Sequence, residues 1–439
     1  MALRLTVIGT GYLGATHAAC MAELGYEVLG MDVDAAKVAR LSAGEVPFYE
    51  PGLPEVLQRN LASGRLRFTT SYDEVAAFGD VHFVCVGTPQ QPGSKAADMS
   101  YVDAVLEGLT PHLTRPCLVV GKSTVPVGTA ERMAEYLAEH APVGTAAELA
   151  WNPEFLREGH AVDDTLRPDR LVIGVRSGEA EKTLREVYAP LLEQDVPLVV
   201  TDFATAQLVK VSANAFLATK ISFINAMAEL CEATGADVTE LSEALSLDPR
   251  IGGQFLRAGL GFGGGCLPKD IRAFMARAGE LGVDQALTFL REVDEINMRR
   301  RGRVVELTKA ALDGTVLGRR IAVLGAAFKP ASDDVRDSPA LNVAAALQLQ
   351  GADVSVHDPE ANANAARIFP SLHYVDSLDD AVAGADAVLV LTEWPQFVAM
   401  DPVAVARQVK RPVVVDARLC LDRERWRDAG WTYVAPGRP

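Results

Sequence analysis

Short apolar runs alternate with helical patterns through the first 200 residues of this chain. Runs of this length that are apolar nearly throughout are typical of strands buried on both faces of a sheet. The helical segments between them indicate βαβ units and therefore a parallel sheet. The alternation stops near residue 200 and restarts after residue 300. The predicted strands are Arg4–Ile8, Glu27–Met31, Val81–Val86, Cys117–Val120, Leu171–Val175 and Val196–Val200, then Arg320–Leu324, Asp353–His357, Ala387–Leu391 and Val413–Asp416.

A different pattern fills the middle of the chain. Residues 203–234 contain neither glycine nor proline, Gly235 follows, and Thr201 and Asp202 are suitable N-caps. We predict one long helix there, apolar over much of its circumference, and such a helix is usually buried between domains or subunits. A second helical stretch is predicted at about Asp284–Ala311. The predicted fold class is α/β, with two Rossmann-like doubly wound domains (residues 1–200 and 301–439) joined by a helical central domain (residues 201–300).

Composition narrows the possible partners. The chain has 439 residues, and 42 Lys+Arg against 58 Asp+Glu give a formal net charge of −16, which argues against general nucleic-acid binding. No apolar stretch reaches the about 18 residues needed to span a membrane, and no secretory segment is visible. None of the six cysteines forms a C-x-x-C pair, so no metal site is expected. We expect a soluble, reduced, cytoplasmic protein.

A dinucleotide fingerprint follows the first predicted strand. The sequence V-I-G-T-G-Y-L-G places Gly9 at a tight turn, Gly11 where backbone must approach a pyrophosphate, and Gly14 where a helix must pack on the strand. The N–H groups at the start of that helix would face the diphosphate. Asp32 ends the second strand, about 20 residues further on, where a carboxylate accepts hydrogen bonds from ribose hydroxyls and repels a 2′-phosphate. The pattern therefore favours NAD. The second α/β region has one glycine, Gly325, in this place and lacks the fingerprint.

A glycine-rich segment ends in a cysteine. Five of the seven residues in Gly259–Gly265 are glycine, and such loops usually exist because backbone must approach something closely. Cys266 follows at once, and Pro268 suits the first turn of a helix. A helix N-terminus and the neighbouring Lys269 would both favour the thiolate. Together with an NAD site, a nucleophilic thiol suggests oxidation of an aldehyde through a thiohemiacetal and a thioester.

Two further pairs are candidates for supporting roles. Lys210 and Asn214 are four residues apart on the predicted long helix and share a face, where a lysine is costly unless it has a partner. Glu154 and Glu158 lie about one turn apart and suit acid–base roles. From the residues alone, Lys210 at a helix edge and two solvated glutamates remain alternative interpretations.

Eight motifs in order resemble the UDP-glucose/GDP-mannose dehydrogenase family over nearly the whole chain. They are Gly9–Gly14, Pro47–Leu53 (PFYEPGL), Val84–Pro89 (VCVGTP), Lys122–Thr129 (KSTVPVGT), Asn152–Gly159 (NPEFLREG), Lys210–Ala218 (KVSANAFLA), Gly261–Asp270 (GFGGGCLPKD) and Phe328–Ser338 (FKPASDDVRDS).

The resemblance implies a four-electron oxidation in which UDP-glucose, two NAD⁺ and water give UDP-glucuronate and two NADH. It implies Cys266 as the nucleophile, Lys210 and Asn214 as holders of the C6 oxygen, and Glu154 as the base in thioester hydrolysis. Asp270, Thr124 and Glu158 match further residues of the reacting centre. The implied cofactor-binding residues are Gly9, Gly11, Tyr12, Leu13, Gly14, Asp32, Lys37, Thr88, Pro89, Thr124, Glu158, Lys269 and Arg336.

The resemblance also implies where the substrate binds and how the chain assembles. The nucleotide-sugar is expected between the two α/β domains, and a homodimer is expected through the long helix, with Arg250 reaching across to the partner. The implied substrate-binding residues are Glu154, Phe155, Leu156, Lys210, Asn214, Arg250, Arg257, Phe262, Gly263, Cys266, Phe328, Lys329 and Arg418.

Three alternatives remain open on sequence. The same chemistry on GDP-mannose or a UDP-N-acetyl-hexosamine would use the same residues. A two-electron dehydrogenase of the hydroxyacid type would need no cysteine. A non-enzymatic NAD-binding regulator would leave Cys266, Lys210, Asn214 and Glu154 without roles.

Overall fold

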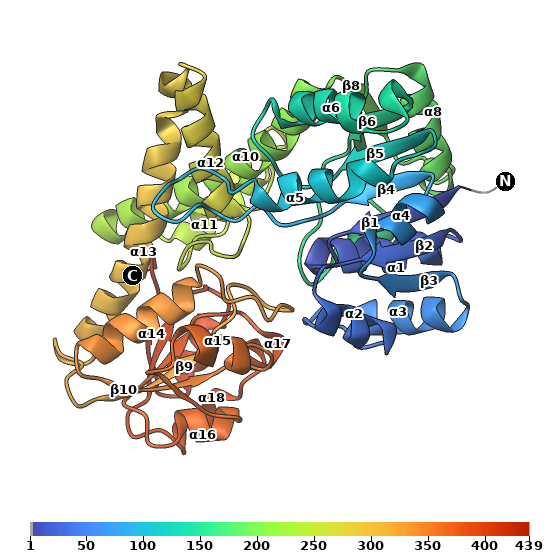
Figure 1. The fold of residues 1–439 in the computed structure, drawn as a ribbon. Helices are drawn as coiled ribbons and strands as arrows, with labels where there is room; N and C mark the ends of the chain where they lie inside the picture. The colour runs from blue at the N-terminus through green and yellow to red at the C-terminus, as the bar shows by residue number, and fades with distance from the viewer. Residues whose placement is uncertain (1–2, 439) are drawn as a thin grey trace. The chain divides into compact units, whose positions relative to one another are not determined.

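A computed structural model describes residues 3–438 (Figure 1). The chain divides into two compact units. Unit 1 runs to Ala213 and includes Arg272–Leu281, and unit 2 contains Asn214–Ile271 and the chain from Gly282 onward. The predicted three-part division into residues 1–200, 201–300 and 301–439 stays a prediction.

Unit 1 is built on an eight-stranded sheet whose strands run parallel from β3 to β6. A single antiparallel bridge, Trp151 to Gly174, joins β6 to β7, so the expectation of a wholly parallel sheet is wrong at this one place. The strands in spatial order are β3 (Leu66–Thr69), β2 (Glu27–Met31), β1 (Arg4–Ile8), β4 (Val81–Val84), β5 (Cys117–Gly121), β6 (Ala147–Trp151), β7 (Leu171–Gly174) and β8 (Leu198–Thr201).

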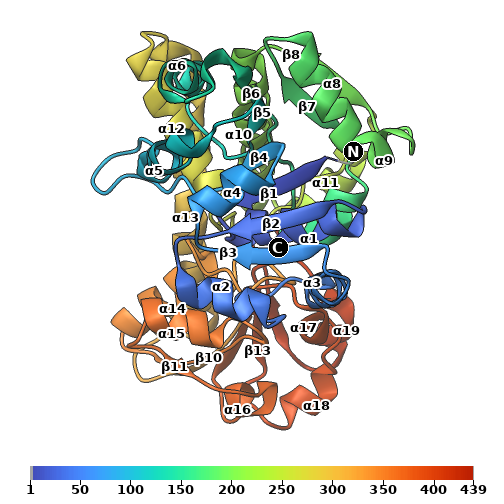
Figure 2. The same ribbon diagram turned by 45° about the vertical axis from the view of Figure 1, so that its right-hand side comes forward.

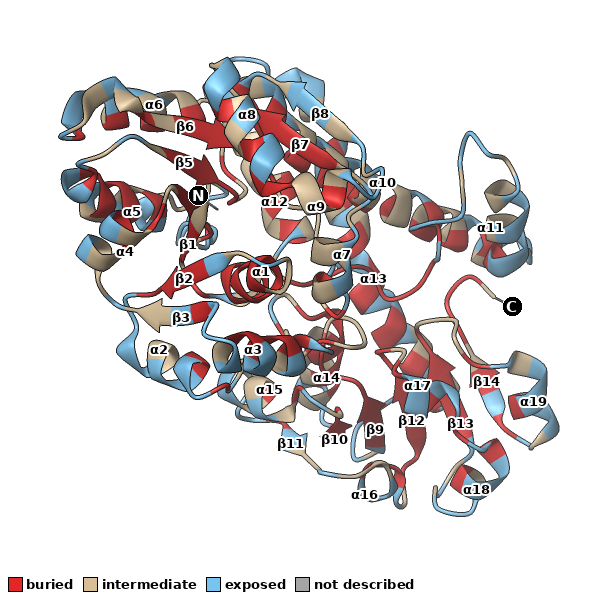
Figure 3. Cartoon of the chain, turned by 90° about the vertical axis from the view of Figure 1, so that its right-hand side faces the viewer, coloured by how far each residue is buried: buried red, intermediate tan, exposed pale blue. Residues whose placement is uncertain are grey.

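Alternating side chains of these strands form two separate cores, one on each face of the sheet. In β1, Val7 belongs to one core and Ile8 to the other, and in β7 Ile173 and Val172 divide in the same way. This two-residue period is the property of strands buried on both faces, which explains why their sequences are apolar nearly throughout. Figure 3 shows inner strands such as β5 as almost wholly buried.

Helices cover both faces of this sheet. Buried residues of α1 and α3 contribute to one core, and those of α5 and α6 to the other. The helices of unit 1 are α1 (Tyr12–Glu23), α2 (Ala35–Ser42), α3 (Leu53–Ala62), α4 (Tyr72–Phe78), α5 (Ser100–Leu109), α6 (Thr129–His140), α7 (Ala161–Leu166), α8 (Gly178–Val187) and α9 (Ala189–Leu192).

Unit 2 contains a six-stranded parallel sheet in an order equivalent to the first six strands of unit 1. Its strands are labelled in Figure 3, and Figure 2 shows the helices around them. The strands in spatial order are β11 (His373–Tyr374), β10 (Asp353–His357), β9 (Arg320–Leu324), β12 (Ala387–Val390), β13 (Val413–Asp416) and β14 (Thr432–Val434). Its helices are α14 (Pro339–Leu349), α15 (Asn362–Ile368), α16 (Leu378–Val382), α17 (Pro395–Val398), α18 (Pro402–Ala406) and α19 (Arg423–Asp428). The predicted pair of doubly wound folds is confirmed.

Within the described residues, four further α-helices are α10 (Phe203–Thr234), α11 (Val238–Ser246), α12 (Leu267–Glu280) and α13 (Phe289–Ala311). The predicted long helix is confirmed as α10, and Asp202 caps it by accepting a hydrogen bond from the backbone N–H of Thr205. A short 3₁₀ turn, Asp284–Leu287, precedes α13, where the sequence predicts continuous helix. Among the described residues, no helix combines the length and apolar character needed to cross a membrane.

Candidate active site

The turn after β1 has the backbone that the fingerprint demands. Gly9 adopts a φ of 89°, which favours glycine. A Cβ placed on Gly14 would lie 1.8 Å from the carbonyl oxygen of Gly9, so α1 packs on this turn only without a side chain there. A Cβ on Gly11 would meet nothing within 4 Å. The space beside Gly11 at the start of α1 therefore fits an approaching diphosphate. Leu13 packs against the core of unit 1.

Asp32 lies at the end of β2, beside this turn, and is buried. Its Oδ2 accepts hydrogen bonds from the backbone N–H and the hydroxyl of Thr10, and it forms an ion pair with Lys37 at 2.8 Å. Burial opposes ionisation, but the hydrogen bond from Lys37 and the backbone N–H of Asp34 outweigh it and lower the pKa of Asp32. The carboxylate is therefore charged at neutral pH. Its Oδ1 accepts one backbone N–H and retains capacity for a ribose hydroxyl.

A buried carboxylate that the sequence analysis missed ties the fingerprint to the NPEFLREG motif. Tyr12 donates a short hydrogen bond to Glu50 Oε2, and Glu50 accepts the backbone N–H groups of Gly159 and Ala161 at 2.7 Å each. Burial and Glu50 raise the pKa of Tyr12. The available signal was a charged residue inside the otherwise apolar PFYEPGL motif. Glu158 lies close enough to Tyr12 to act on its pKa electrostatically.

Two other expected cofactor residues contact each other. The buried Thr88 donates its hydroxyl to the carbonyl oxygen of Thr124 at 2.7 Å, which joins the loops after β4 and β5. Pro89 is exposed and accepts the backbone N–H of Asp98. These loops leave the carboxyl ends of neighbouring strands, where ligands of doubly wound sheets bind.

Glu154 and Lys210 form a largely buried ion pair at 2.9 Å. The second carboxylate oxygen of Glu154 accepts the backbone N–H of Leu156 at 2.6 Å. The ring of Phe155 faces two cations, with Arg170 Cζ at 4.0 Å and Lys210 Nζ at 5.7 Å from its centroid. The alternatives of an unpaired lysine at a helix edge and a fully solvated Glu154 are therefore wrong.

Asn214, one helical turn after Lys210 on α10, contacts α12, the helix that directly follows Cys266. Its Nδ2 donates to Asp270 Oδ2 at 2.6 Å, and Lys269 pairs with the other oxygen of Asp270 at 2.5 Å. Asp270 and Asn214 are both buried, whereas Cys266 is exposed. Because α12 starts at Leu267, Cys266 immediately precedes the helix, with Pro268 in its first turn as predicted.

The glycine-rich loop before Cys266 is held by buried polar side chains of α10 and α13. Asn297 accepts the backbone N–H of Phe262 at 2.7 Å and donates to the carbonyl oxygen of the same residue at 2.9 Å. Asn225 accepts the N–H of Gly259, and Arg300 donates to its carbonyl oxygen. These three residues carried no motif signal, because their role depends on where the loop runs.

Several expected substrate residues gather around the same loop. A Cβ on Gly263 would lie 2.4 Å from the carbonyl oxygen of Asp337, one on Gly264 would meet the ring of Phe328, and one on Gly265 would lie 2.2 Å from Arg336 Cζ. Lys329 Nζ lies 5.5 Å from the centroid of the Phe328 ring. Arg418 links the glycine-rich loop to the segment after β9, because it donates to the carbonyl oxygens of Gly261 and Phe328.

The structure leaves two expected arginines at the surface. Arg250 is exposed and forms a bidentate pair with Asp248, two residues before it. Arg257 is also exposed. Their expected roles in substrate binding remain predictions.

Unit 2 has its own counterpart of Asp32. Asp358 follows β10 as Asp32 follows β2, but its Oδ2 accepts the backbone N–H groups of Ala326 and Ala327 and the indole N–H of Trp394. Asp358 is only 2% exposed. The carboxylate that would serve a ribose is here used within the protein, which agrees with the missing glycines after β9.

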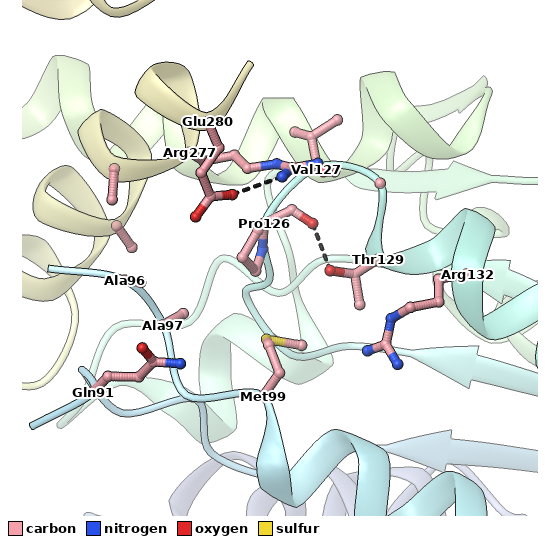
Figure 4. Close-up of a pocket in the computed structure, with 13 residues that line it drawn as sticks. Gln91, Ala96, Ala97, Met99, Pro126, Val127, Thr129, Arg132, Arg277 and Glu280 are labelled. Carbon is pink, nitrogen blue, oxygen red and sulfur yellow. Dashed lines mark hydrogen bonds and ion pairs between the residues drawn. The ribbon is translucent and has the colours of Figure 1, made fainter. Parts of the chain in front are cut away.

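A hollow of about 360 Å³ lies in unit 1 (Figure 4). Its wall includes the turn before α6 and one side of α12. Arg277 crosses it, donating to the carbonyl oxygen of Val127 and pairing with Glu280 at 2.7 Å. None of its 13 lining residues belongs to the expected site.

Comparison with known proteins agrees with this arrangement. The UDP-glucose/GDP-mannose dehydrogenase family is described by three domain models, and all match: the NAD binding domain at residues 3–192, the central domain at 204–299 and the UDP binding domain at 322–423. A UDP-glucose 6-dehydrogenase of Rhizobium meliloti is 41% identical over 439 residues, covering 100% of both chains. One of Pseudomonas aeruginosa is 43% identical over 453 residues, covering 100% of this chain and 98% of the relative.

A solved structure is similar throughout. The UDP-glucose dehydrogenase of the archaeon Pyrobaculum islandicum superimposes with a TM-score of 0.92 at 40% identity, covering 100% of this chain and 98% of that one. The predicted NAD-binding and UDP-binding folds are thus confirmed at the level of the family. The chain belongs to the UDP-glucose/GDP-mannose dehydrogenase family.

Proposed function

We propose that this protein oxidises the C6 alcohol of UDP-glucose to a carboxylate, consuming two NAD⁺ and one water. Loss of a first hydride from C6 and of the hydroxyl proton gives the C6 aldehyde. The sulfur of Cys266 adds to the aldehyde carbon to give a thiohemiacetal, and loss of a second hydride gives a thioester. Water then adds to the thioester carbon, the C–S bond breaks, and the thiol is restored. The relatives named UDP-glucose 6-dehydrogenase, which align over the whole chain, support this choice of substrate.

One observation carries the proposal most directly. On α10, Lys210 and Asn214 are one turn apart, and each has a carboxylate partner, the largely buried Glu154 and the buried Asp270 respectively. Asp270 is in the first turn of the helix that Cys266 precedes. The two donors for a C6 oxygen and the candidate base are therefore held in ion-paired or hydrogen-bonded positions, and the exposed nucleophile lies one turn before Asp270, an arrangement that a scaffold protein would not need.

The residues around Gly11 fit the cofactor. NAD⁺ would supply a hydride acceptor for each oxidation. The free space beside Gly11 would admit the diphosphate of NAD⁺, and Asp32 would accept hydrogen bonds from its ribose hydroxyls. The other residues expected to line the cofactor site include Tyr12, Lys37, Thr88, Pro89 and Thr124.

Counting NADH per UDP-glucose consumed tests the reaction. We expect two NADH per sugar and one carboxylate. A two-electron dehydrogenase would give one NADH, and a regulator none. The Cys266→Ser variant separates the first two cases further, because it should lose acid formation while the fold is retained. Full turnover by that variant would contradict the covalent route.

Substrate choice needs its own comparison. UDP-glucose, GDP-mannose, UDP-N-acetyl-glucosamine and UDP-N-acetyl-mannosamine would be offered under the same conditions, with NADH release as the signal. We expect UDP-glucose to have the highest kcat/KM. A higher value for another of the four sugars would reassign the substrate while leaving the chemistry intact.

We further propose that residues 1–200 bind NAD, residues 301–439 bind the UDP moiety, and residues 201–300 connect them and form a homodimer. The support for a dimer is an exposed apolar stripe on α10. Phe216, Phe223 and Leu230 are 66%, 49% and 58% exposed and recur every seven residues, so they share one face. Arg250, exposed nearby in sequence, is the residue proposed to reach the partner's substrate.

A further inference from the structure

Unit 1 contains a second buried lysine that the proposed chemistry does not use. Lys122 follows β5 directly, in the KSTVPVGT motif, and only 6% of it is exposed. A buried ammonium group is costly unless its protons are satisfied or nearby charges compensate. The hydrogen bonds and charges around Lys122 therefore indicate its role.

The hydrogen bonds of Lys122 lead to the segment that carries Glu154. Its Nζ donates to Asn152 Oδ1 at 2.8 Å. The same oxygen accepts the hydroxyl of Tyr188 at 2.5 Å, and Asn152 Nδ2 donates to the carbonyl oxygen of Val172 at 2.8 Å. The amide of Asn152 is thus fixed at both ends. Because only Pro153 separates Asn152 from Glu154, this network sets the direction in which the chain leaves β6.

The backbone brings the two residues to the same edge of the sheet. β5 and β6 are parallel neighbours, with Gly121 opposite Trp151, and the N–H of Asn152 donates to the carbonyl oxygen of Gly121 at 2.8 Å. Lys122 and Asn152 are the next residue after each strand. They meet where the carboxyl ends of parallel strands form ligand sites in this fold.

The charges around Lys122 include both members of the Glu154–Lys210 pair. Burial lowers the pKa of Lys122 to about 8, Cys85 and Glu154 favour its charged form, and Lys210 opposes it. Burial raises the pKa of Cys85 to about 12 and holds the pKa of His17 well below its usual range, so both are neutral near pH 7. Glu154 is then the anion that Lys122 faces.

We propose that Lys122 is a positioning residue for Glu154, holding its segment through Asn152 and placing a second positive charge near its carboxylate. This inference rests on the proposed function, in which Glu154 accepts a proton from the water that hydrolyses the thioester. An ionised Glu154 is required at that step, because a protonated carboxyl group cannot act as the base. The hydride-loss steps do not require it.

Three substitutions separate charge from shape. Lys122→Gln retains a donor for Asn152 and removes the charge, Lys122→Met removes both, and Lys122→Arg retains the charge. Lys182→Gln is the matched control, because that side chain is 74% exposed on α8. Circular dichroism and thermal melting would establish which variants fold, and if Lys122→Met does not, Lys122→Gln carries the test.

The measurement is the pH dependence of acid formation, together with intact-protein mass spectrometry of reactions quenched during turnover with UDP-glucose and NAD⁺. For Lys122→Gln we expect the acid limb of kcat to move up by roughly one pH unit. Hydrolysis should slow by about tenfold or more, so that a covalent adduct on Cys266 accumulates. Lys122→Arg should keep the limb nearer its wild-type position, and Lys182→Gln should match wild type.

An unchanged acid limb in Lys122→Gln, with every step slowed equally or none slowed, would overturn the proposal and leave Lys122 a structural residue. Failure of the proposed function has a different signature: the wild-type protein itself would not release two NADH per UDP-glucose or form an adduct on Cys266.

Discussion

Asp32 is the residue on which cofactor choice depends. Its carboxylate is ionised and has acceptor capacity at Oδ1. Replacing it with asparagine removes a charged acceptor, and hydrogen bonds to charged groups contribute about 1.5–3 kcal/mol, so the KM for NAD⁺ should rise by roughly 10- to 100-fold. Steady-state kinetics at varied NAD⁺ concentration would measure this change in KM.

Asp358→Asn is the matched control for Asp32→Asn. It alters the equivalent carboxylate of unit 2, whose partners are all internal, so it should lower thermal stability and leave the KM for NAD⁺ unchanged. Equal effects of the two substitutions on that KM would contradict the assignment of the cofactor to unit 1.

A buried histidine should make the protein sensitive to acid. Burial lowers the pKa of His82 to about 3, from 6.5 in a model peptide. Its contribution to stability is therefore complete above about pH 6.5 and is lost as the pH falls towards 3, at up to about 1.4 kcal/mol per pH unit.

Denaturant unfolding at pH 7 and pH 5 would show this dependence. His82→Asn should lose less free energy of unfolding than wild type when the pH is lowered from 7 to 5. Asn keeps a polar group opposite Thr6, the partner of His82 Nδ1. His140→Asn, at an exposed position, should leave the loss as it is. A loss that is the same in all three proteins would assign acid sensitivity to other groups.

At this scale the sequence predicted residues that have a chemical signature and missed those defined by burial. The glycines, Asp32, Lys210 and Cys266 stand in patterns whose chemistry demands them. Lys122, Glu50 and Asn297 are polar residues that become important only because the fold buries them next to a loop or strand end. Nothing in a single sequence distinguishes such a residue from a solvated one.

The turn between β1 and α1 gives a prediction for an element. A Cβ on Gly14 would overlap the carbonyl oxygen of Gly9, whereas one on Gly11 meets no atom of the protein. Gly11 has a φ of −71°, which alanine adopts freely. Gly14→Ala should therefore lower the free energy of unfolding by about 1–3 kcal/mol as α1 is forced from the sheet.

Gly11→Ala should fold normally and raise the KM for NAD⁺, because its methyl group would occupy the space meant for the diphosphate. Thermal melting with and without NAD⁺ distinguishes the Gly14→Ala variant from the Gly11→Ala variant. If Gly11→Ala kept wild-type stabilisation by NAD⁺, the diphosphate would have to bind elsewhere.

The glycine-rich loop gives a second prediction. Asn297→Ala removes two buried hydrogen bonds to Phe262, each contributing about 1 kcal/mol, and so should destabilise unit 2 by about 2 kcal/mol. The KM for UDP-glucose should rise while that for NAD⁺ stays constant. Asn297→Asp retains the acceptor for the N–H of Phe262 but buries a carboxylate against the carbonyl oxygen of the same residue, so it should destabilise the protein at least as much as Asn297→Ala. An effect confined to NAD⁺ would count against a substrate role for this loop.

Elements were predictable where their apolar pattern is continuous. β1, β2, β9 and β10 have the predicted bounds, as does α10. The strands missed are β3, β6, β11 and β14. β3, β11 and β14 are short strands near or at sheet edges, where one side lacks a partner and polar residues are tolerated, and β6 (AELAW) is rich in alanine and contains a glutamate. The antiparallel bridge from β6 to β7 depends on the path of residues 152–170, which local sequence does not determine.

For the whole molecule, the apolar stripe on α10 predicts the state of assembly. Phe223→Glu places a charge in the middle of the stripe and should convert a dimer to a monomer, since a buried unpaired charge disfavours association. Light scattering after size-exclusion chromatography would give the mass. Leu349→Glu is the control, because Leu349 is 87% exposed at the end of α14. A wild-type protein that is monomeric, or a Phe223→Glu dimer, would contradict this role of α10.

The internal use of Asp358 has a consequence for how such a molecule can arise. Two sheets with equivalent strand order, each followed by an aspartate at the same place, are what duplication of one ancestral unit would leave. In one copy the aspartate remained available to a ligand. In the other, a second backbone amide and an indole N–H also donate to the carboxylate, so the ancestral ligand could be lost without losing the residue that once held it. Specialisation of the second copy then required new hydrogen-bond partners for an old side chain, and left that copy free to bind a different nucleotide.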